Sequence, residues 1–193
     1  KPTWMTRQVR QEEVKMKIGI VTFHSAHNYG AVLQAWSLQE YLRQQGHQVE
    51  IVNLRLPVID KLYRLVNKTD KKVCKSEWLN RMVNGAYYGV RYVYRHLRPD
   101  AGKVEKYRKF EQFINRQLPV TKEFHTYEEL CGAQLEYDAL IAGSDQIWNA
   151  VMMRNISPAY FLHFANEDAL RISYAASIGT EEIPAEYKML FRR

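Results

Sequence analysis

The sequence has few cysteines and no long hydrophobic run, and these absences exclude several classes of protein. Its two cysteines, Cys74 and Cys131, form neither a Cys-x-x-Cys pair nor a Cys/His cluster with zinc spacing. No apolar stretch approaches the ~18 residues that a membrane-spanning helix needs. Residues 1–15 are polar and basic and lack the apolar centre of a secretory signal. These features predict a cytoplasmic protein with reduced thiols and no bound metal.

Two common phosphate-binding patterns are also missing. The sequence contains no G-x-G-x-x-G fingerprint and no G-x-x-x-x-G-K-[ST] loop, which removes support for a standard dinucleotide site or P-loop. The net charge of +7 is concentrated in residues 61–99, where ten basic residues accompany two acidic ones. Because this segment has no base-reading motif, we expect no nucleic-acid partner. Its six aromatic residues suggest peripheral contact with an anionic membrane, and a solvated helical face is the alternative.

What the sequence does contain is the alternation of strands and helices that is typical of a parallel sheet. Lys17–His24 and Gln48–Leu54 are nearly continuous apolar runs, which suit strands buried on both faces, and the helix between them has apolar residues at helical spacing. Such a unit is almost always parallel and right-handed. Further strands are predicted at 137–142, 160–164 and 171–177. The predicted fold class is therefore α/β, a Rossmann-like doubly wound parallel sheet.

The length of 193 residues is sufficient for one domain with a sizeable core. We expect residues 16–193 to form that domain and residues 1–15 to be a disordered extension. The basic stretch at about 58–100 is predicted to be an insertion of two short helices. Further helices are predicted over Val104–Gln117 and Tyr127–Cys131, and another after Pro184.

Three polar loops follow the C-terminal ends of predicted strands, at His24–Tyr29, Gly143–Asn149 and Ser177–Gly179. Ligands of open parallel sheets bind at that edge, so we expect the loops to converge there. The first loop opens a helix, whose free N–H groups and dipole favour an anion near Gly30, with Asn28 as N-cap. In the alternative interpretation Asn28 is only a cap and Gly30 only a packing glycine.

The second loop carries side chains suited to binding a sugar. Ser144, Asp145, Gln146 and Asn149 supply hydrogen-bond donors and acceptors, and Trp148 supplies a flat apolar face. The same residues could equally form a tight turn, in which Asp145 caps the next element and Trp148 belongs to the core.

Two histidines of the first loop are candidates for chemistry. His24 and His27 have no carboxylate or cysteine partner at ligand spacing, so we expect no metal there. His27 could act as a general acid or base because its unperturbed pKa is near neutral, and a solvated side chain is the alternative.

At these residues the sequence resembles the polysaccharide pyruvyl transferase family. Five segments carry the resemblance, in order: Ile18–His24, Asn28–Ala35, Tyr137–Asn149, Tyr160–Phe164 and Arg171–Gly179. The resemblance implies a two-domain architecture like that of the GT-B glycosyltransferases, with this chain as the N-terminal half. Members transfer a pyruvyl group from phosphoenolpyruvate to a sugar of a cell-surface glycan as a ketal, without a cofactor.

The resemblance also implies which residues line the cleft. The family's phosphoenolpyruvate-binding Arg and His residues lie mainly in its C-terminal half, so this chain would supply the opposite wall. That wall would consist of His27, Asn28, Tyr29, Gly30, Ser144, Asp145, Gln146, Trp148 and Asn149. Asp145 or His27 would be the general base for the sugar hydroxyl.

These implications predict a bacterial enzyme of exopolysaccharide biosynthesis. Its partners would be phosphoenolpyruvate as donor and a glycan or lipid-linked sugar as acceptor, and we expect the 193-residue chain alone to be inactive. Because one fold hosts many functions, two alternatives stay open. One is a GT-B-type nucleotide-sugar glycosyltransferase, and the other is a non-catalytic binding module that docks on membranes.

Overall fold

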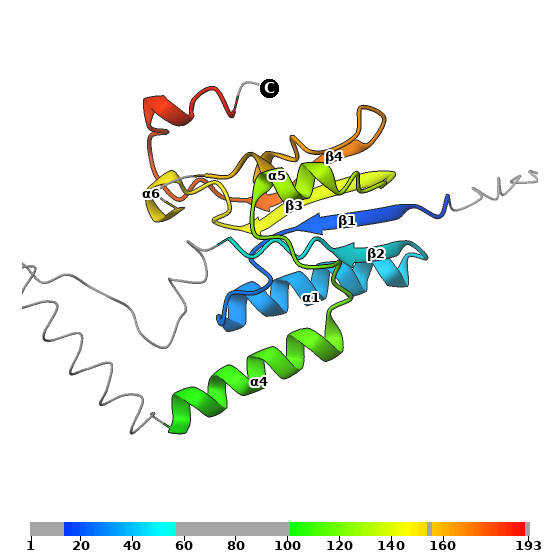
Figure 1. Cartoon of the computed structure of the whole chain (residues 1–193), viewed down its shortest axis with the longest axis vertical. Coiled ribbons are helices and arrows are strands. Elements are labelled where there is room, and N and C mark those ends of the chain that lie inside the picture. Colours follow the sequence, from blue (N-terminus) through cyan, green and yellow to red (C-terminus); the bar gives the residue numbers. More distant parts are fainter. Residues whose placement is uncertain (1–13, 57–100, 154–155, 192–193) are drawn as a thin grey trace, which may run out of the picture.

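The computed structural model describes residues 14–56, 101–153 and 156–191 (Figure 1). Most of the predicted N-terminal extension lies outside these residues. So do the whole predicted basic insertion, with the membrane contact expected of residues 61–99, and Cys74. Among the described residues, no helix is long and apolar enough to cross a membrane.

Four parallel strands form one sheet with the order β2-β1-β3-β4. The strands are β1 (Lys17–Val21), β2 (Gln48–Ile51), β3 (Ala139–Asp145) and β4 (Leu170–Ala176). The helices are α1 (Tyr29–Gln44), α4 (Ala101–Gln117), α5 (Tyr127–Gly132) and α6 (Ala150–Met153), with 3-10 turns η1 (Pro158–Phe161) and η2 (Ala185–Tyr187). The predicted α/β class and the parallel sheet are therefore confirmed.

The order of the strands explains where a ligand would bind. The chain places β2 on one side of β1 and later adds β3 and β4 on the other side, so the direction of winding reverses between β1 and β3. Such a reversal leaves a crevice beyond the carboxyl ends of the two strands, where open α/β sheets bind ligands. The first two predicted polar loops follow these two strands.

Helix α1 forms where its capping residues predict it. The Asn28 side chain accepts a hydrogen bond from the Gly30 N–H at 2.8 Å, and the chain turns out of the helix at Gly46 with φ of 90°. The small, buried side chains of Ala31 and Ala35 let the helix pack closely on the sheet.

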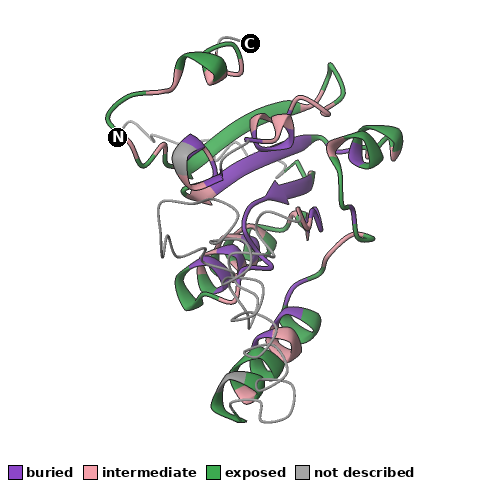
Figure 2. Ribbon diagram, turned by 60° about the vertical axis from the view of Figure 1, so that its left-hand side comes forward, coloured by how far each residue is buried: buried purple, intermediate pink, exposed green. Residues whose placement is uncertain are grey.

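The sheet has an apolar core on each face. One face, with Ile20 of β1 and Ile141 of β3, packs against α1 and against Phe110 of α4. The other face, with Leu140 of β3, packs against α5 and η1, where Tyr160 is buried. Strands β1 and β3 are accordingly buried, whereas β4 at the sheet edge is exposed along its length (Figure 2).

Two predicted elements have a different form in the structure. The strand predicted at 160–164 is wrong, because this stretch contains the end of η1 and a turn. Pro158 and the capping hydroxyl of Ser157 start that 3-10 turn, and Leu162 ends it with φ of 59°. The alternation of buried and less buried side chains in this short turn gave the sequence the same pattern as a strand. The helix predicted after Pro184 is the single turn η2.

Candidate active site

The loops after β1 and β3 are joined by a three-residue hydrogen-bond network. The Thr22 hydroxyl donates to the Ser144 carbonyl at 3.0 Å, and the Gln34 amide donates to that hydroxyl at 2.8 Å. The Gln34 carbonyl oxygen accepts from the Ser144 hydroxyl at 2.6 Å and from the Ser144 N–H at 3.2 Å. Helix α1 thus fixes the position of the second loop against the end of β1.

The loop after β4 joins the same assembly. The Ser177 N–H donates to the Asp145 carbonyl at 2.9 Å, and the Trp148 N–H donates to the Ser177 carbonyl at 3.3 Å. Gly179 lies so close to the second loop that an added Cβ would come within 2.5 Å of the Asn149 amide nitrogen. The predicted convergence of the three loops at the carboxyl edge of the sheet is therefore confirmed.

The backbone of the second loop takes unusual conformations. Gly143 has φ of 132° and Asp145 has φ of 102°, and the peptide bond between Gly143 and Ser144 is cis. Only glycine adopts the first conformation readily, and aspartate is one of few other residues found at positive φ. The Gly-Ser-Asp sequence is thus matched to this turn.

Asp145 is the last residue of β3, and its carbonyl accepts the hydrogen bond from the third loop. Its side chain is partly buried, and its Oδ1 accepts the Gln146 N–H at 2.7 Å. Among the described residues, no lysine, arginine or histidine forms an ion pair with this carboxylate. The carboxylate is therefore held in place by its own turn.

Of the other predicted residues of the second loop, Gln146 lies at the surface and Asn149 is buried. Gln146 is exposed, and its Oε1 accepts from the Asn149 amide at 2.8 Å. Asn149 is buried, and its Oδ1 caps α6 through the Met152 N–H. These bonds leave Gln146 as the loop's exposed polar side chain and give Asn149 a structural part.

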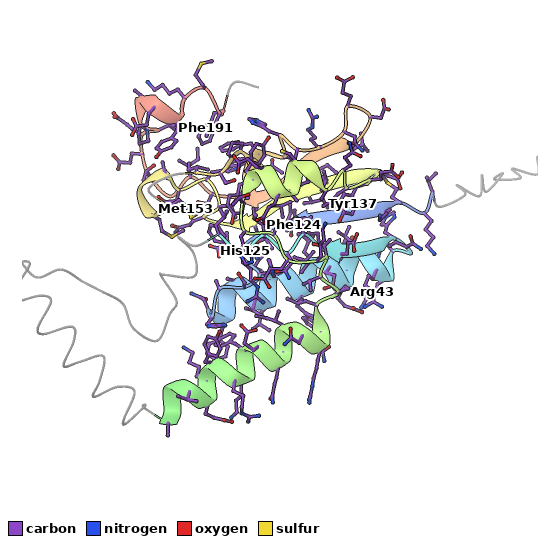
Figure 3. The ribbon with its side chains drawn as sticks, in the orientation of Figure 1. Arg43, Phe124, His125, Tyr137, Met153 and Phe191 are labelled. Carbon is purple, nitrogen blue, oxygen red and sulfur yellow. The ribbon has the colours of Figure 1, made fainter. Side chains whose placement is uncertain are left out.

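Trp148 has the packing role that the sequence left open. Its indole N–H donates to the Tyr160 carbonyl at 2.9 Å, and its ring stacks on Phe161 with a centroid separation of 5.4 Å. Phe191, which is labelled in Figure 3 and follows η2, meets the same ring edge-on. The two ring centroids are 5.9 Å apart. One face of the indole is therefore covered by protein.

The start of α1 offers less to an anion than the sequence suggests. The N–H groups of Gly30 and Val32 are already bound to the side chain and carbonyl of Asn28, at 2.8 and 3.1 Å. Two of the four N–H groups expected to be free are thus occupied. Asn28, Tyr29 and Gly30 are all exposed.

His27 faces helix α4. Its Nε2 lies 2.8 Å from Glu111 Oε1 and, because a carboxylate only accepts, the imidazole donates this bond. Arg55 Nη2 lies 3.8 Å from the other oxygen of Glu111, and the Tyr107 ring packs edge-on against the imidazole at 4.2 Å. The structure therefore brings His27 together with Glu111, and the side chains of His27 and Asp145 form no hydrogen bond or ion pair with each other.

His24 is enclosed beneath the first loop. It is fully buried, with Nε2 at 3.0 Å from Asn53 Oδ1 and Nδ1 at 3.3 Å from the Thr22 carbonyl. Burial lowers the pKa of the imidazole and keeps it neutral. His24 consequently supports the loop and is shielded from any substrate.

The hydrogen bond between His27 and Glu111 predicts a pH-dependent stability. The hydrogen bond from His27 lowers the pKa of Glu111 below its usual value of 4.5, with a further contribution from Arg55. A carboxyl whose pKa is lowered by folding stabilises the fold above its unfolded pKa and loses that contribution as the pH falls through the folded pKa. Glu111→Gln should therefore reduce the free energy of unfolding at pH 7 by about 1 kcal/mol.

Chemical denaturation of both proteins across a pH series checks this expectation. The difference between Glu111→Gln and the unchanged chain should shrink as the pH falls below 4.5, because the wild-type carboxyl then becomes neutral too. The exposed Glu181, changed to Gln, is the matched control and should have little effect at any pH. A difference for Glu111→Gln that stays constant into acid would rule out the ionised Glu111 carboxylate as its cause.

Comparison with known proteins agrees with the motifs at this site. The family model described as polysaccharide pyruvyl transferase matches residues 28–193, which begins at the N-cap of α1 and includes all of β3 and β4. The chain belongs to the polysaccharide pyruvyl transferase family. No curated protein and no solved structure matches it significantly. Within the described residues, no group of three or more His, Cys, Asp or Glu is arranged to hold a metal.

For this member of the pyruvyl transferase family, two residues of the site escaped the sequence analysis. Gln34 and Thr22 hold the second loop in place. They lie inside a predicted helix and a predicted strand, whereas the predicted site residues lie in the loops or directly beside them. A signal existed for Gln34: it stands one helical turn after Gly30, at the end of α1 nearest the loops. Such a polar side chain reaches the carboxyl ends of the strands.

Proposed function

We propose that this member of the family transfers a pyruvyl group from phosphoenolpyruvate to two hydroxyl groups of one sugar in a glycan, forming a ketal. The observation that carries the proposal is the position of the Gly143–Asn149 loop. This loop, the most characteristic segment of the resemblance, lies at the point where the winding of the sheet reverses. That point is where the fold provides a crevice for a substrate.

The reaction balances without an oxidant or a cofactor. The CH2 carbon of phosphoenolpyruvate gains a proton and becomes a methyl group, and one sugar hydroxyl oxygen bonds to the adjacent carbon. The bond from that carbon to the phosphate oxygen breaks, phosphate leaves, and a second hydroxyl completes the ketal. Of the two hydroxyl protons, one is accounted for by the methyl group and the other by hydrogen phosphate. The protein must therefore remove protons from hydroxyls and supply one to carbon.

Asp145 is the better of the two proposed general bases. Its carboxylate has no cationic partner among the described residues, and its backbone is fixed by the turn on one side and by Ser177 on the other. His27 donates from Nε2 to Glu111, which turns its ring toward helix α4 and leaves Nδ1 as its acceptor nitrogen. We assign proton removal to Asp145. We assign to His27 a structural role, in which it links the first loop to Glu111 of α4.

The other exposed groups would contact the acceptor. Gln146, Asn28 and those N–H groups at the start of α1 that are not bound to Asn28 would offer hydrogen bonds to sugar hydroxyls. Ser144, held by Gln34, would support the loop that carries them. Trp148 and Asn149 would stabilise the conformation of the loop through their hydrogen bonds to Tyr160 and Met152. In the family that the chain resembles, the contacts to phosphoenolpyruvate come mainly from arginine and histidine residues of the C-terminal half.

The product of the complete gene tests the proposal. Incubated with phosphoenolpyruvate and candidate glycans, it should release phosphate and attach pyruvate in equal amounts, the latter seen by NMR as a ketal methyl group. Transfer of a sugar from a nucleotide sugar, with phosphoenolpyruvate unchanged, would instead identify a glycosyltransferase that uses the same fold.

A further inference from the structure

A groove lies between α1 and α4. Its volume is about 260 Å³. The lining residues are Tyr29, Val32, Leu33, Lys109, Phe110 and Phe113. Five of these six side chains are apolar or aromatic, so the floor of the groove is hydrophobic. Figure 1 shows the two helices running alongside each other below the sheet.

Part of this apolar surface is open to solvent. Tyr29 is 65 % exposed and Leu33 is 47 % exposed, and they stand one helical turn apart on α1. On α4, Val104 and Tyr107 are also among the exposed large hydrophobic residues. Exposed apolar side chains that gather in this way usually mark a contact surface.

The rim of the groove is positively charged. The Lys106 ammonium group lies 5.4 Å from the centre of the Tyr29 ring and 5.6 Å from that of Phe110, and Lys109 lines the groove itself. The two acidic residues of α4 compensate this charge only in part. Glu111 is turned inward to His27, and Glu105 pairs with Arg108 at 2.6 Å and with Lys109 at 3.7 Å, whereas Lys106 forms no ion pair among the described residues.

We propose that this α1–α4 face docks on the surface of an anionic lipid bilayer. Lysine side chains are attracted to anionic headgroups, aromatic rings settle at the headgroup level, and apolar side chains such as Leu33 enter the boundary with the acyl chains. The face defined by Tyr29, Leu33, Lys106 and Lys109 combines these three kinds of group on described residues.

The proposal stands independently of the proposed transfer reaction. Docking would nevertheless have a consequence for the active site, because Tyr29 directly follows Asn28 at the edge of the crevice. A bilayer in contact with the groove would therefore lie close to the carboxyl ends of the strands. An acceptor held at a membrane surface would reach the site without leaving that surface.

The experiment is co-sedimentation of the chain with vesicles of phosphatidylcholine, with and without phosphatidylglycerol, at low and high salt. Binding should require the anionic lipid and weaken with salt. Lys106→Glu with Lys109→Glu should reduce the affinity at least about 25-fold, since each basic group near the surface contributes about fivefold. Leu33→Asn should weaken binding severalfold at both salt concentrations.

The matched control reverses two lysines elsewhere. Lys15 and Lys188 are exposed, and changing both to Glu alters the net charge equally. Figure 1 shows the segment of Lys188 on the opposite side of the sheet from α4. This double variant should bind nearly as the wild type does. A third variant, Arg91→Gln with Arg95→Gln and Arg98→Gln, measures separately the contact predicted for residues 61–99.

Three results would overturn the proposal. They are no binding to anionic vesicles at low salt, unchanged binding by the Lys106/Lys109 variant, and an equal loss in the Lys15/Lys188 control. Circular dichroism of each variant confirms that a loss of binding is not a loss of folding. If vesicles are not bound, sedimentation velocity of the wild type would show whether a second copy covers the groove instead.

Discussion

Changing Gly143 to alanine should destabilise the domain by roughly 3–5 kcal/mol, because a positive φ and a steric overlap in a packed strand each cost a few kcal/mol. Gly143 has φ of 132°, and a Cβ at this position would overlap the carbonyl oxygen of Tyr174 and lie 2.9 Å from its carbonyl carbon. Both obstacles are backbone atoms of the paired strand β4. Neither can move without opening the β3–β4 ladder.

Urea denaturation measures this effect, with Gly132→Ala as the control. Gly132 ends helix α5, and an added Cβ there would meet no atom within 4 Å. Alanine is the better helix former, so this control should be neutral or more stable by up to ~1 kcal/mol. Equal stability of Gly143→Ala and the wild type would show that the second loop does not have the conformation described.

Changing Asp145 to asparagine should reduce turnover at least ~10²-fold in the product of the complete gene, the effect typical of losing an acid–base group. Asparagine keeps the acceptor that Gln146 needs and tolerates the φ of 102°. The midpoint of thermal unfolding should therefore change little. Proton transfer is the property that this substitution removes.

The control is a second aspartate in the same strand region. Asp138 immediately precedes β3, and its Oδ2 accepts the Lys17 N–H at 2.6 Å, at the opposite end of the strand from Asp145. Asp138→Asn should leave turnover nearly unchanged. Normal specific activity of Asp145→Asn together with a large loss of stability would mean that Asp145 is only a turn residue.

The sheet could be predicted from the sequence because burial on two faces leaves a simple pattern. Ile18, Ile20 and Val21 form an apolar run that only a central parallel strand accommodates, and the alanines of α1 recur at helical spacing. The turn η1 could not be predicted in the same way. Its Tyr160 and Leu162 are buried like strand residues, and only Pro158 signalled a helical turn.

The site was predicted at the level of loops and less well at the level of side chains. Sequence position alone placed Ser144 and Asp145 at the carboxyl edge, because loops that follow parallel strands meet there. It could not show that the Trp148 indole N–H donates a hydrogen bond to the Tyr160 carbonyl. Nor could it show that His27 donates to Glu111, which lies in a helix far along the chain. Such contacts depend on residues distant in sequence.

The measurement that tests the account most directly follows the fate of phosphoenolpyruvate. The product of the complete gene is mixed with phosphoenolpyruvate labelled with ¹³C in the pyruvyl methylene group and with a glycan acceptor, and the products are followed by NMR. We predict a methyl signal of a pyruvate ketal on the sugar, phosphate release in equal amount, and loss of both in Asp145→Asn. Unchanged phosphoenolpyruvate, with glycosyl transfer from a nucleotide sugar to the same acceptor, would contradict the account.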